Sequence, residues 1–137
     1  MKISVLLADD SEIMRNAIVR LLQVVPDIQI LGEASGFNQT IELATKLHPQ
    51  VIVLDLHMDD ESSVTPSLLK YGLMGSWVLA MSIWNDDVTK SFAKAIGAAA
   101  LLEKTTLVTE LIPAIRKCAG GQNLDELLSE IADDPVN

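Results

Sequence analysis

The sequence predicts an α/β fold with a doubly wound, five-stranded parallel sheet and helices on both faces. Two observations predict it. Apolar segments of strand length alternate along the chain with segments of helical periodicity, at short intervals. The apolar segments, of which Val51-Ile52-Val53-Leu54 is the clearest, lack polar alternation, which is typical of strands covered on both faces. Parallel strands of this kind are joined by right-handed helical crossovers.

Five apolar runs predict the strands, and end signals delimit the helices between them. The strands are expected at 3–8, 28–33, 51–55, 77–82 and 99–103. The first helix follows the turn Asp9-Asp10-Ser11 and ends at Pro26, which cannot continue it. The other four are expected at 37–47, after a Ser62-Ser63 cap with Pro66 in the first turn, between an Asn85 or Asp86 cap and Gly97, and at 107–118.

Composition argues against nucleic-acid binding and against a membrane location. The formal charge of −9, from 10 Lys and Arg against 19 Asp and Glu, provides no basic patch for phosphates but is compatible with a cation or a basic partner. The single cysteine, Cys118, excludes an internal disulfide and fits a reducing cytosol. Because no apolar run approaches membrane-spanning length and no cleavage pattern follows the first one, we expect a soluble, unprocessed, cytoplasmic protein.

Polar residues with related chemistry follow four of the predicted strands. Asp9 and Asp10 come after the first, Asp55 ends the third, Ser82 ends the fourth and Lys104 follows the fifth. The carboxyl ends of parallel strands meet at one edge of a sheet, where ligands of such folds bind. We therefore expect three carboxylates, a hydroxyl and a lysine to converge there.

Each of these residues also has an ordinary interpretation. Asp9-Asp10-Ser11 can be a helix N-cap, Asp55 a solvated strand end, and Ser82 and Lys104 unremarkable surface positions. The combination favours one chemistry, phosphoryl transfer to a carboxylate. Magnesium binds two or three carboxylates and an incoming phosphoryl group, a lysine supplies a second cation, and a hydroxyl donates a hydrogen bond. One aspartate can then act as the nucleophile.

The set Asp9-Asp10, Asp55-Leu56-His57-Met58, Ser82, and Gly97-Ala98 with Lys104 resembles the receiver domain of bacterial two-component response regulators. The resemblance covers roughly residues 3–118. The stretches LGEAS, HPQVIVLDLHM and ELIPAIRK are most similar to receivers of nitrate-response-type helix-turn-helix regulators.

This resemblance implies a flavodoxin-like sheet with strand order 2-1-3-4-5 and assigns roles to the site residues. By position, Asp55 would be the phosphoacceptor. Mg²⁺ would be held by Asp10, by Asp9 chiefly through water, by Asp55 and by the backbone carbonyl of His57. Ser82 and Lys104 would bind the phosphoryl group, with Ser82 moving toward it as the switch.

The sequence departs from the family pattern at several positions. Asp59 and Ser63 stand where proline and glycine are usual, and Thr105 follows Lys104 where proline is common. Leu101 stands where a switch tyrosine or phenylalanine is expected. Asp59 and Asp60 can crowd the site with negative charge, although we expect them to be solvated as part of a loop.

His57 and Trp84 suggest control of the lifetime of the phosphoryl group. Each lies two residues beyond a site residue, Asp55 and Ser82 respectively. Rings at these positions can overhang an aspartyl phosphate and hinder the attacking water, or can simply pack on loops. The first alternative predicts a long-lived phosphoryl state.

The predicted function is that of a phosphoacceptor signalling domain, not an enzyme beyond its own phosphotransfer and autodephosphorylation. The donor would be a sensor histidine kinase or a phosphotransfer protein. The output would be protein contact, with a downstream protein or an output domain absent from this chain. The alternatives are a pseudo-receiver that binds a partner without phosphorylation, a magnesium-dependent phosphohydrolase, which normally needs an aspartate where His57 stands, and a small-molecule-binding flavodoxin-like module, for which no phosphate loop follows the first strand.

We expect a receiver domain at 1–119 and a helical tail or linker at 120–137. The tail has an apolar stripe at helical spacing, which can pack on the domain, bind a partner or pair two copies into a homodimer. This stripe consists of Leu124, Leu127, Leu128 and Ile131.

Overall fold

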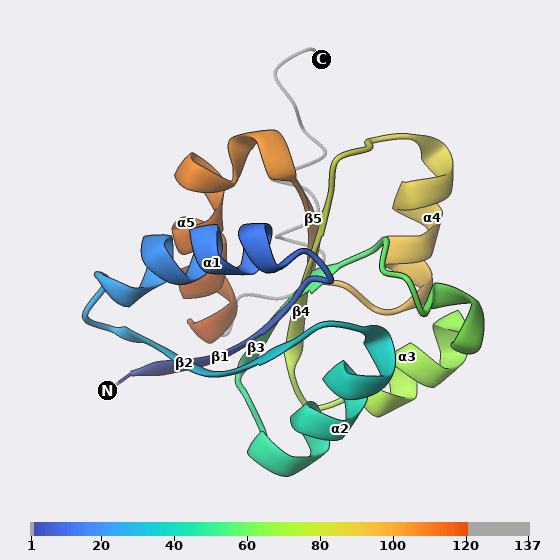
Figure 1. Cartoon of the computed structure of the whole chain (residues 1–137), viewed down its shortest axis with the longest axis horizontal. Coiled ribbons are helices and arrows are strands. Elements are labelled where there is room, and N and C mark those ends of the chain that lie inside the picture. The colour runs from blue at the N-terminus through green and yellow to red at the C-terminus, as the bar shows by residue number, and fades with distance from the viewer. Residues whose placement is uncertain (1, 121–137) are drawn as a thin grey trace.

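The computed structural model describes residues 2–120 and contains five parallel strands in one sheet, in the order β2-β1-β3-β4-β5. Figure 1 shows the strands in the middle of the molecule with helices on either side. This confirms the predicted fold class and strand order. The strands are β1 (Ile3–Ala8), β2 (Ile28–Ala34), β3 (Val51–Asp55), β4 (Trp77–Ser82) and β5 (Ala100–Glu103).

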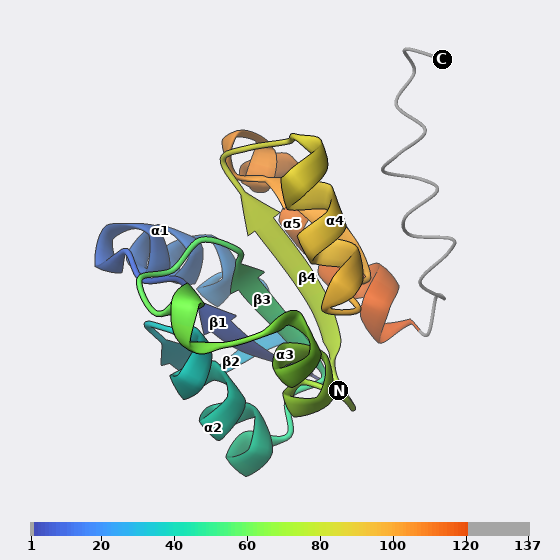
Figure 2. The same ribbon diagram turned by 90° about the vertical axis from the view of Figure 1, so that its right-hand side faces the viewer.

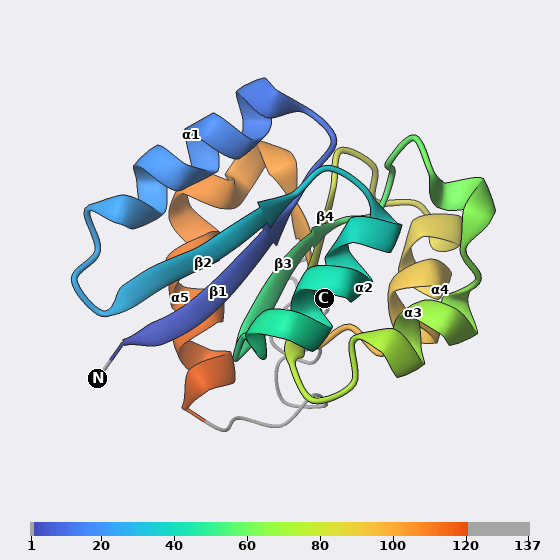
Figure 3. The same cartoon turned by 60° about the horizontal axis from the view of Figure 1, so that its bottom comes forward.

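The helices divide between the two faces of the sheet (Figures 2 and 3). Helices α1 and α5 cover one face, and α2, α3 and α4 cover the other. Two short 3₁₀ turns, η1 and η2, precede α3 and α5. The bounds are α1 (Glu12–Gln23), α2 (Phe37–Leu47), η1 (Glu61–Ser63), α3 (Pro66–Gly72), α4 (Asp87–Ala95), η2 (Lys104–Thr106) and α5 (Leu107–Ala119).

The continuous apolar runs of the strands supply both layers of the core. In β3, Val51 and Val53 pack with α1 and α5, whereas Ile52 and Leu54 pack with α2, α3 and α4. Successive side chains of a strand point to opposite faces, so a strand covered on both sides needs an apolar residue at every position. All four side chains are fully buried.

The start of α3 corrects one prediction. Ser62 and Ser63 do not cap it, because they lie in η1, and the Thr65 hydroxyl instead accepts a hydrogen bond from the Leu68 backbone N–H at 3.1 Å. Pro66 disfavours helical backbone at the residue before it, so Thr65 is extended and becomes the N-cap. The predicted cap of α4 is confirmed, since the Asp86 carboxylate accepts from the Thr89 N–H at 2.8 Å.

Helix α5 buries Cys118 completely against the face of the sheet that it shares with α1. Burial raises the pKa of this thiol to about 11. Among residues 2–120, no helix combines the length and apolarity that crossing a membrane requires. The predicted tail beyond Gly120, with its leucine stripe, lies outside the described residues.

Candidate functional site

The strand register brings three carboxylates together at the carboxyl edge of the sheet. Asp9 directly follows β1 and Asp55 ends β3, and these two strands are paired neighbours with Ala8 opposite Leu54. One carboxylate oxygen from each of Asp9, Asp10 and Asp55 lies within 4.8 Å of the others. Oxygen ligands in this number suit Mg²⁺, which keeps several waters and needs few protein ligands. The predicted acidic cluster is therefore present.

Lys104, the first residue after β5, reaches into this cluster. Its Nζ lies 2.8 Å from Oδ2 of Asp9 and 3.3 Å from Oδ2 of Asp55. The lysine side chain is 15% exposed, and the two carboxylates are almost fully buried. Burial disfavours the ammonium, but the hydrogen bond to Asp9 and the charges of both carboxylates outweigh burial and raise the pKa of Lys104. The lysine thus remains charged beside the two acids.

Asp55 is the carboxylate most affected by this environment. Burial, and after it the negative charge of Asp9, raises the pKa of Asp55 from its ordinary 3.8 to about 7. The Lys104 charge and the hydrogen bond from the His57 backbone N–H, at 3.2 Å from Oδ1, act in the opposite direction without cancelling the rise. The interpretation of Asp55 as a solvated strand end is wrong, because the residue is 2% exposed.

Asp9 is held by backbone and side-chain contacts on several sides. Its Oδ1 accepts from the Ser11 N–H at 2.9 Å, and its own N–H donates to the carbonyl of Ala34 at 3.0 Å. Arg15, on α1, donates from Nη1 to the Asp9 carbonyl at 2.7 Å and pairs through Nε with Glu33 at 3.4 Å. Sequence reasoning missed Arg15, because an arginine on an amphipathic helix gives no signal that distinguishes it from a surface residue.

The loop after β3 contacts the acidic cluster through its backbone. The N–H of Asp59 donates to Oδ2 of Asp10 at 3.1 Å. Proline, the residue that the family pattern leads us to expect here, has no N–H and could not make this contact. The Asp59 side chain is exposed, as expected. The departure from the pattern therefore adds a donor to a carboxylate that is a candidate metal ligand.

Asp60 corrects the prediction that this loop has only solvated acids. Its carboxylate accepts from the backbone N–H groups of Phe37 at 2.8 Å and Asn38 at 3.1 Å, at the start of α2, and from Nδ2 of Asn38 at 3.1 Å. Partial burial opposes the charge, but these donors outweigh it and lower the pKa of Asp60. A Cβ on Gly36 would lie 2.9 Å from Oδ2 of Asp60, so a larger residue at this position would displace the carboxylate. We call this contact the Asp60 clamp.

We expect Asp60→Ala to lower the free energy of unfolding by about 1 kcal/mol, because the mutation removes the carboxylate that accepts from the first N–H groups of α2, as an N-cap side chain would. Asp60→Asn, which keeps one acceptor oxygen, should lose less. Urea denaturation of the metal-free proteins measures the effect. Asp59→Ala is the matched control, since it removes an exposed acid from the same loop and keeps the backbone N–H; an equal loss in this control would argue against the clamp.

Ser82 lies at the same edge, but its hydroxyl is directed elsewhere. It is fully buried at the end of β4, and Oγ accepts a hydrogen bond from the Trp84 backbone N–H at 2.9 Å. Within residues 2–120 it makes no hydrogen bond to the carboxylates or to Lys104. Trp84 packs edge-to-face on His57, with 4.6 Å between ring centroids and an interplanar angle of 81°. The two rings that the sequence suggested could overhang Asp55 are thus in contact with each other in the structure.

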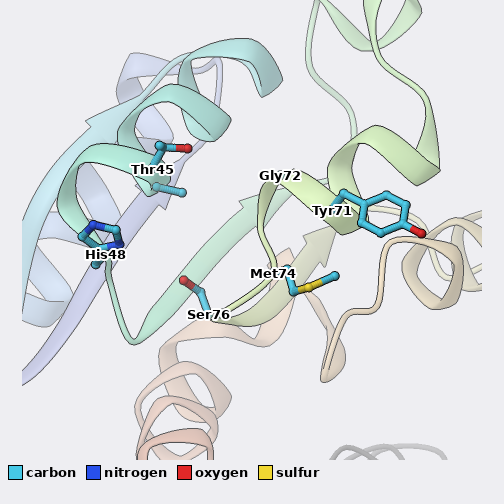
Figure 4. A pocket seen from close by; sticks show the side chains of 8 residues that line it. Thr45, His48, Tyr71, Gly72, Met74 and Ser76 are labelled. Atoms are coloured by element: carbon cyan, nitrogen blue, oxygen red, sulfur yellow. The ribbon is translucent and has the colours of Figure 1, made fainter.

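A separate hollow lies at the opposite edge of the sheet, between the ends of α2 and α3 (Figure 4). Its lining includes His48, Tyr71, Met74 and Ser76, and none of the residues that line it is a carboxylate or a lysine. Since it precedes the starts of β3 and β4, it is remote from the strand ends that carry the acidic cluster. It is no part of the candidate site.

Comparisons with known proteins agree with this arrangement. The family model of the response regulator receiver domain matches residues 5–116. Among curated proteins, the chain is 34% identical over 88% of its length to the transcriptional regulatory protein LiaR of Bacillus subtilis, and 32% identical over 93% to the nitrate/nitrite response regulator NarL of Escherichia coli. These matches cover 57% and 60% of the relatives, so the chain spans less than two thirds of their length.

Solved structures give the same result. The signal receiver domain of NarL from Mycobacterium tuberculosis superposes with a TM-score of 0.76 at 30% identity, covering 88% of this chain and 98% of that one. The response regulator domain of CheB from Thermotoga maritima superposes with a TM-score of 0.75 over 86% of this chain and 96% of that one. At 24% identity, the second match concerns the fold alone.

Proposed function

Because the chain belongs to the response regulator receiver domain family of two-component systems, we propose that it accepts a phosphoryl group on Asp55. The observation that supports this most directly is the arrangement around Asp55, a buried carboxylate with Lys104 at 3.3 Å and two further aspartates beside it. The donor would be the phosphohistidine of a sensor kinase or of a phosphotransfer protein. Phosphorylation would change a protein-interaction surface.

In the proposed reaction, a carboxylate oxygen of Asp55 forms a bond to phosphorus while the bond from phosphorus to the donor imidazole breaks. The leaving imidazole takes up a proton from solvent, and the product is an acyl phosphate on Asp55. Lys104 stabilises the charge that spreads over the phosphoryl oxygens. The Ser82 hydroxyl would donate a hydrogen bond to one of these oxygens.

Mg²⁺ fits the donor set of this site. Three carboxylates that share a small volume with one lysine carry more negative charge than the lysine compensates, and all their oxygens are hard ligands. Asp9, Asp10 and Asp55, with the backbone carbonyl of His57, would hold the ion. When bound, it supplies positive charge to the carboxylates and to the phosphoryl oxygens.

Receiver domains are signalling domains, so we propose that turnover is limited to phosphotransfer and autodephosphorylation of the chain itself. We take residues 1–119 as the receiver and 120–137 as a tail or linker that leads toward an output element. Output would pass through a partner protein or an attached domain. The cytoplasm, where sensor kinases present their phosphohistidine, is the proposed location.

The proposal is tested by the intact mass of the protein after incubation with Mg²⁺ and acetyl phosphate. We expect a gain of one phosphoryl group on the parent and none on Asp55→Asn. Asp27→Asn is the matched control, because it removes a carboxylate that pairs with Arg116 at the start of β2, at the opposite end of the strands from the acidic cluster. A parent that stays unmodified, with its circular dichroism unchanged, would contradict the proposal and favour a pseudo-receiver.

The His57 and Trp84 side chains support a long-lived phosphoryl state, because each follows by two residues a group that the phosphoryl group would contact, and either ring can restrict the approach of water. We expect the half-life of the acyl phosphate to shorten several-fold when both residues become alanine. Intact mass followed over time after removal of acetyl phosphate measures this half-life. An unchanged half-life would mean that the rings only pack on each other and shield nothing.

A further inference from the structure

The usual aromatic readout position of a receiver is filled here by a side chain that cannot serve in the same way. Leu101, on β5, is partly buried and packs against the core layer formed with α2, α3 and α4. Its side chain has neither a ring nor a polar atom, so it cannot signal by moving such a group between a buried and an exposed position. A signal from Asp55 to the surface must therefore use other groups of this chain.

The His57–Trp84 ring pair is attached at both ends to the groups that a phosphoryl group on Asp55 would contact. The backbone N–H of His57 donates to Oδ1 of Asp55 at 3.2 Å. The backbone N–H of Trp84 donates to Oγ of Ser82 at 2.9 Å. The rings meet edge-to-face with 4.6 Å between their centroids. The contact between the rings thus spans the phosphoacceptor and the serine.

The two rings differ in their surroundings. Nε2 of His57 is buried and has no hydrogen-bond partner among the described residues. Trp84 is 51% exposed, and Ile83 and Val88, one and four residues away in the sequence, are 61% and 78% exposed. The His57 ring therefore has a buried edge, while about half of Trp84 faces solvent. A displacement of Trp84 would therefore change the surface of the protein directly.

Resting on the proposed function, we propose that the His57–Trp84 contact is the readout of the phosphoryl state. Within residues 2–120, the Ser82 hydroxyl accepts one hydrogen bond and donates none, so its proton is available to a phosphoryl oxygen. When the Ser82 hydroxyl moves toward that oxygen, the backbone N–H of Trp84 must move with it or lose its hydrogen bond to Oγ. His57 remains bound to Asp55, so the two rings separate.

Tryptophan fluorescence tests this separation. The chain has two tryptophans, so Trp77→Phe leaves Trp84 as the single reporter. We expect the acrylamide quenching constant of Trp84 to rise about twofold after phosphorylation with Mg²⁺ and acetyl phosphate, since half of the side chain is covered at the start. The intact mass of the same sample is also measured, so that phosphorylation is determined independently of the fluorescence.

Three further variants, all in the Trp77→Phe background, locate the coupling. His57→Ala keeps the backbone N–H and removes the ring, so its quenching constant should be high before phosphorylation and should change little afterwards. Ser82→Ala, once its mass shows the phosphoryl group, should give no rise. Leu101→Ala should keep the full response. A response that survives in either of the first two variants, or that is lost in the third, overturns the inference.

The outcomes also separate this inference from the proposed function. A sample that is phosphorylated by mass but has an unchanged Trp84 quenching constant overturns the readout and leaves the phosphoacceptor role standing. A sample that gains no phosphoryl group overturns both.

Discussion

Replacing Lys104 with methionine is expected to cost about 3 kcal/mol of unfolding free energy in metal-free, mildly alkaline buffer. The ammonium lies within 3.3 Å of both Asp9 and Asp55, and those carboxylates are almost completely buried. Methionine keeps much of the side-chain volume and removes the charge, so the variant measures the electrostatic contribution. Urea denaturation at equilibrium gives the value. Added Mg²⁺ should restore a large part of the loss, because it supplies positive charge to the same oxygens.

The same variant should accept a phosphoryl group roughly 100-fold more slowly, which is the usual effect of removing one group that stabilises transition-state charge. Acetyl phosphate and intact mass measure this rate. Lys90→Met is the matched control, since Lys90 is exposed on α4 and forms no ion pair within the described chain. If the control and Lys104→Met behaved alike, the lysine would have no special role at the cluster.

The second large effect concerns Asp55, whose pKa is raised from 3.8 to about 7, chiefly by burial. The folded protein therefore binds a proton more tightly at this group than the unfolded chain does. The stability from this group is complete below about pH 4 and is lost as the pH rises through about 7. Asp55→Asn should accordingly raise the unfolding free energy at neutral pH by about 2 kcal/mol and flatten its pH dependence in this range.

Magnesium should reverse this order of stability. At a concentration 100 times its dissociation constant, the ion would stabilise the parent by about 2.7 kcal/mol. Asp55→Asn, with one carboxylate fewer, should gain less, and chelation should return the parent to its lower value. Thermal or urea unfolding with and without a chelator measures both changes. An Asp55→Asn protein that is less stable than the metal-free parent at neutral pH would contradict the assigned cause of the pKa shift.

The parts of the site that follow from topology could be predicted from the sequence. Asp9, Asp55 and Lys104 each stand at a strand end, and parallel strands bring such ends to one edge whatever the details of the loops. The run Val51–Asp55 needed only the rule that a strand covered on both faces is apolar throughout. The acidic cluster was therefore found as predicted, and the strand order that the family resemblance implies was confirmed.

The parts that depend on loop conformation could not be predicted. The Asp60 clamp depends on a glycine at position 36 and on the turn that aims the carboxylate at α2. The Arg15 contact with the Asp9 carbonyl depends on the rotamer of a long side chain. Thr65 rather than the serines caps α3, because Pro66 restricts the backbone of the residue before it, a local rule that the sequence does contain. The Asp60 clamp and the Arg15 contact cannot be predicted from residue types and their spacing.

The buried cysteine of α5 has a consequence for dynamics. Cys118 is fully inaccessible, and its pKa of about 11 leaves almost no thiolate at neutral pH. A thiol reagent can therefore modify it only while α5 is transiently detached from the sheet, and the labelling rate is governed by the free energy of that local opening. The labelling rate thus reports the opening of one helix without any substitution in the chain, at a position remote from the edge that carries the acidic cluster.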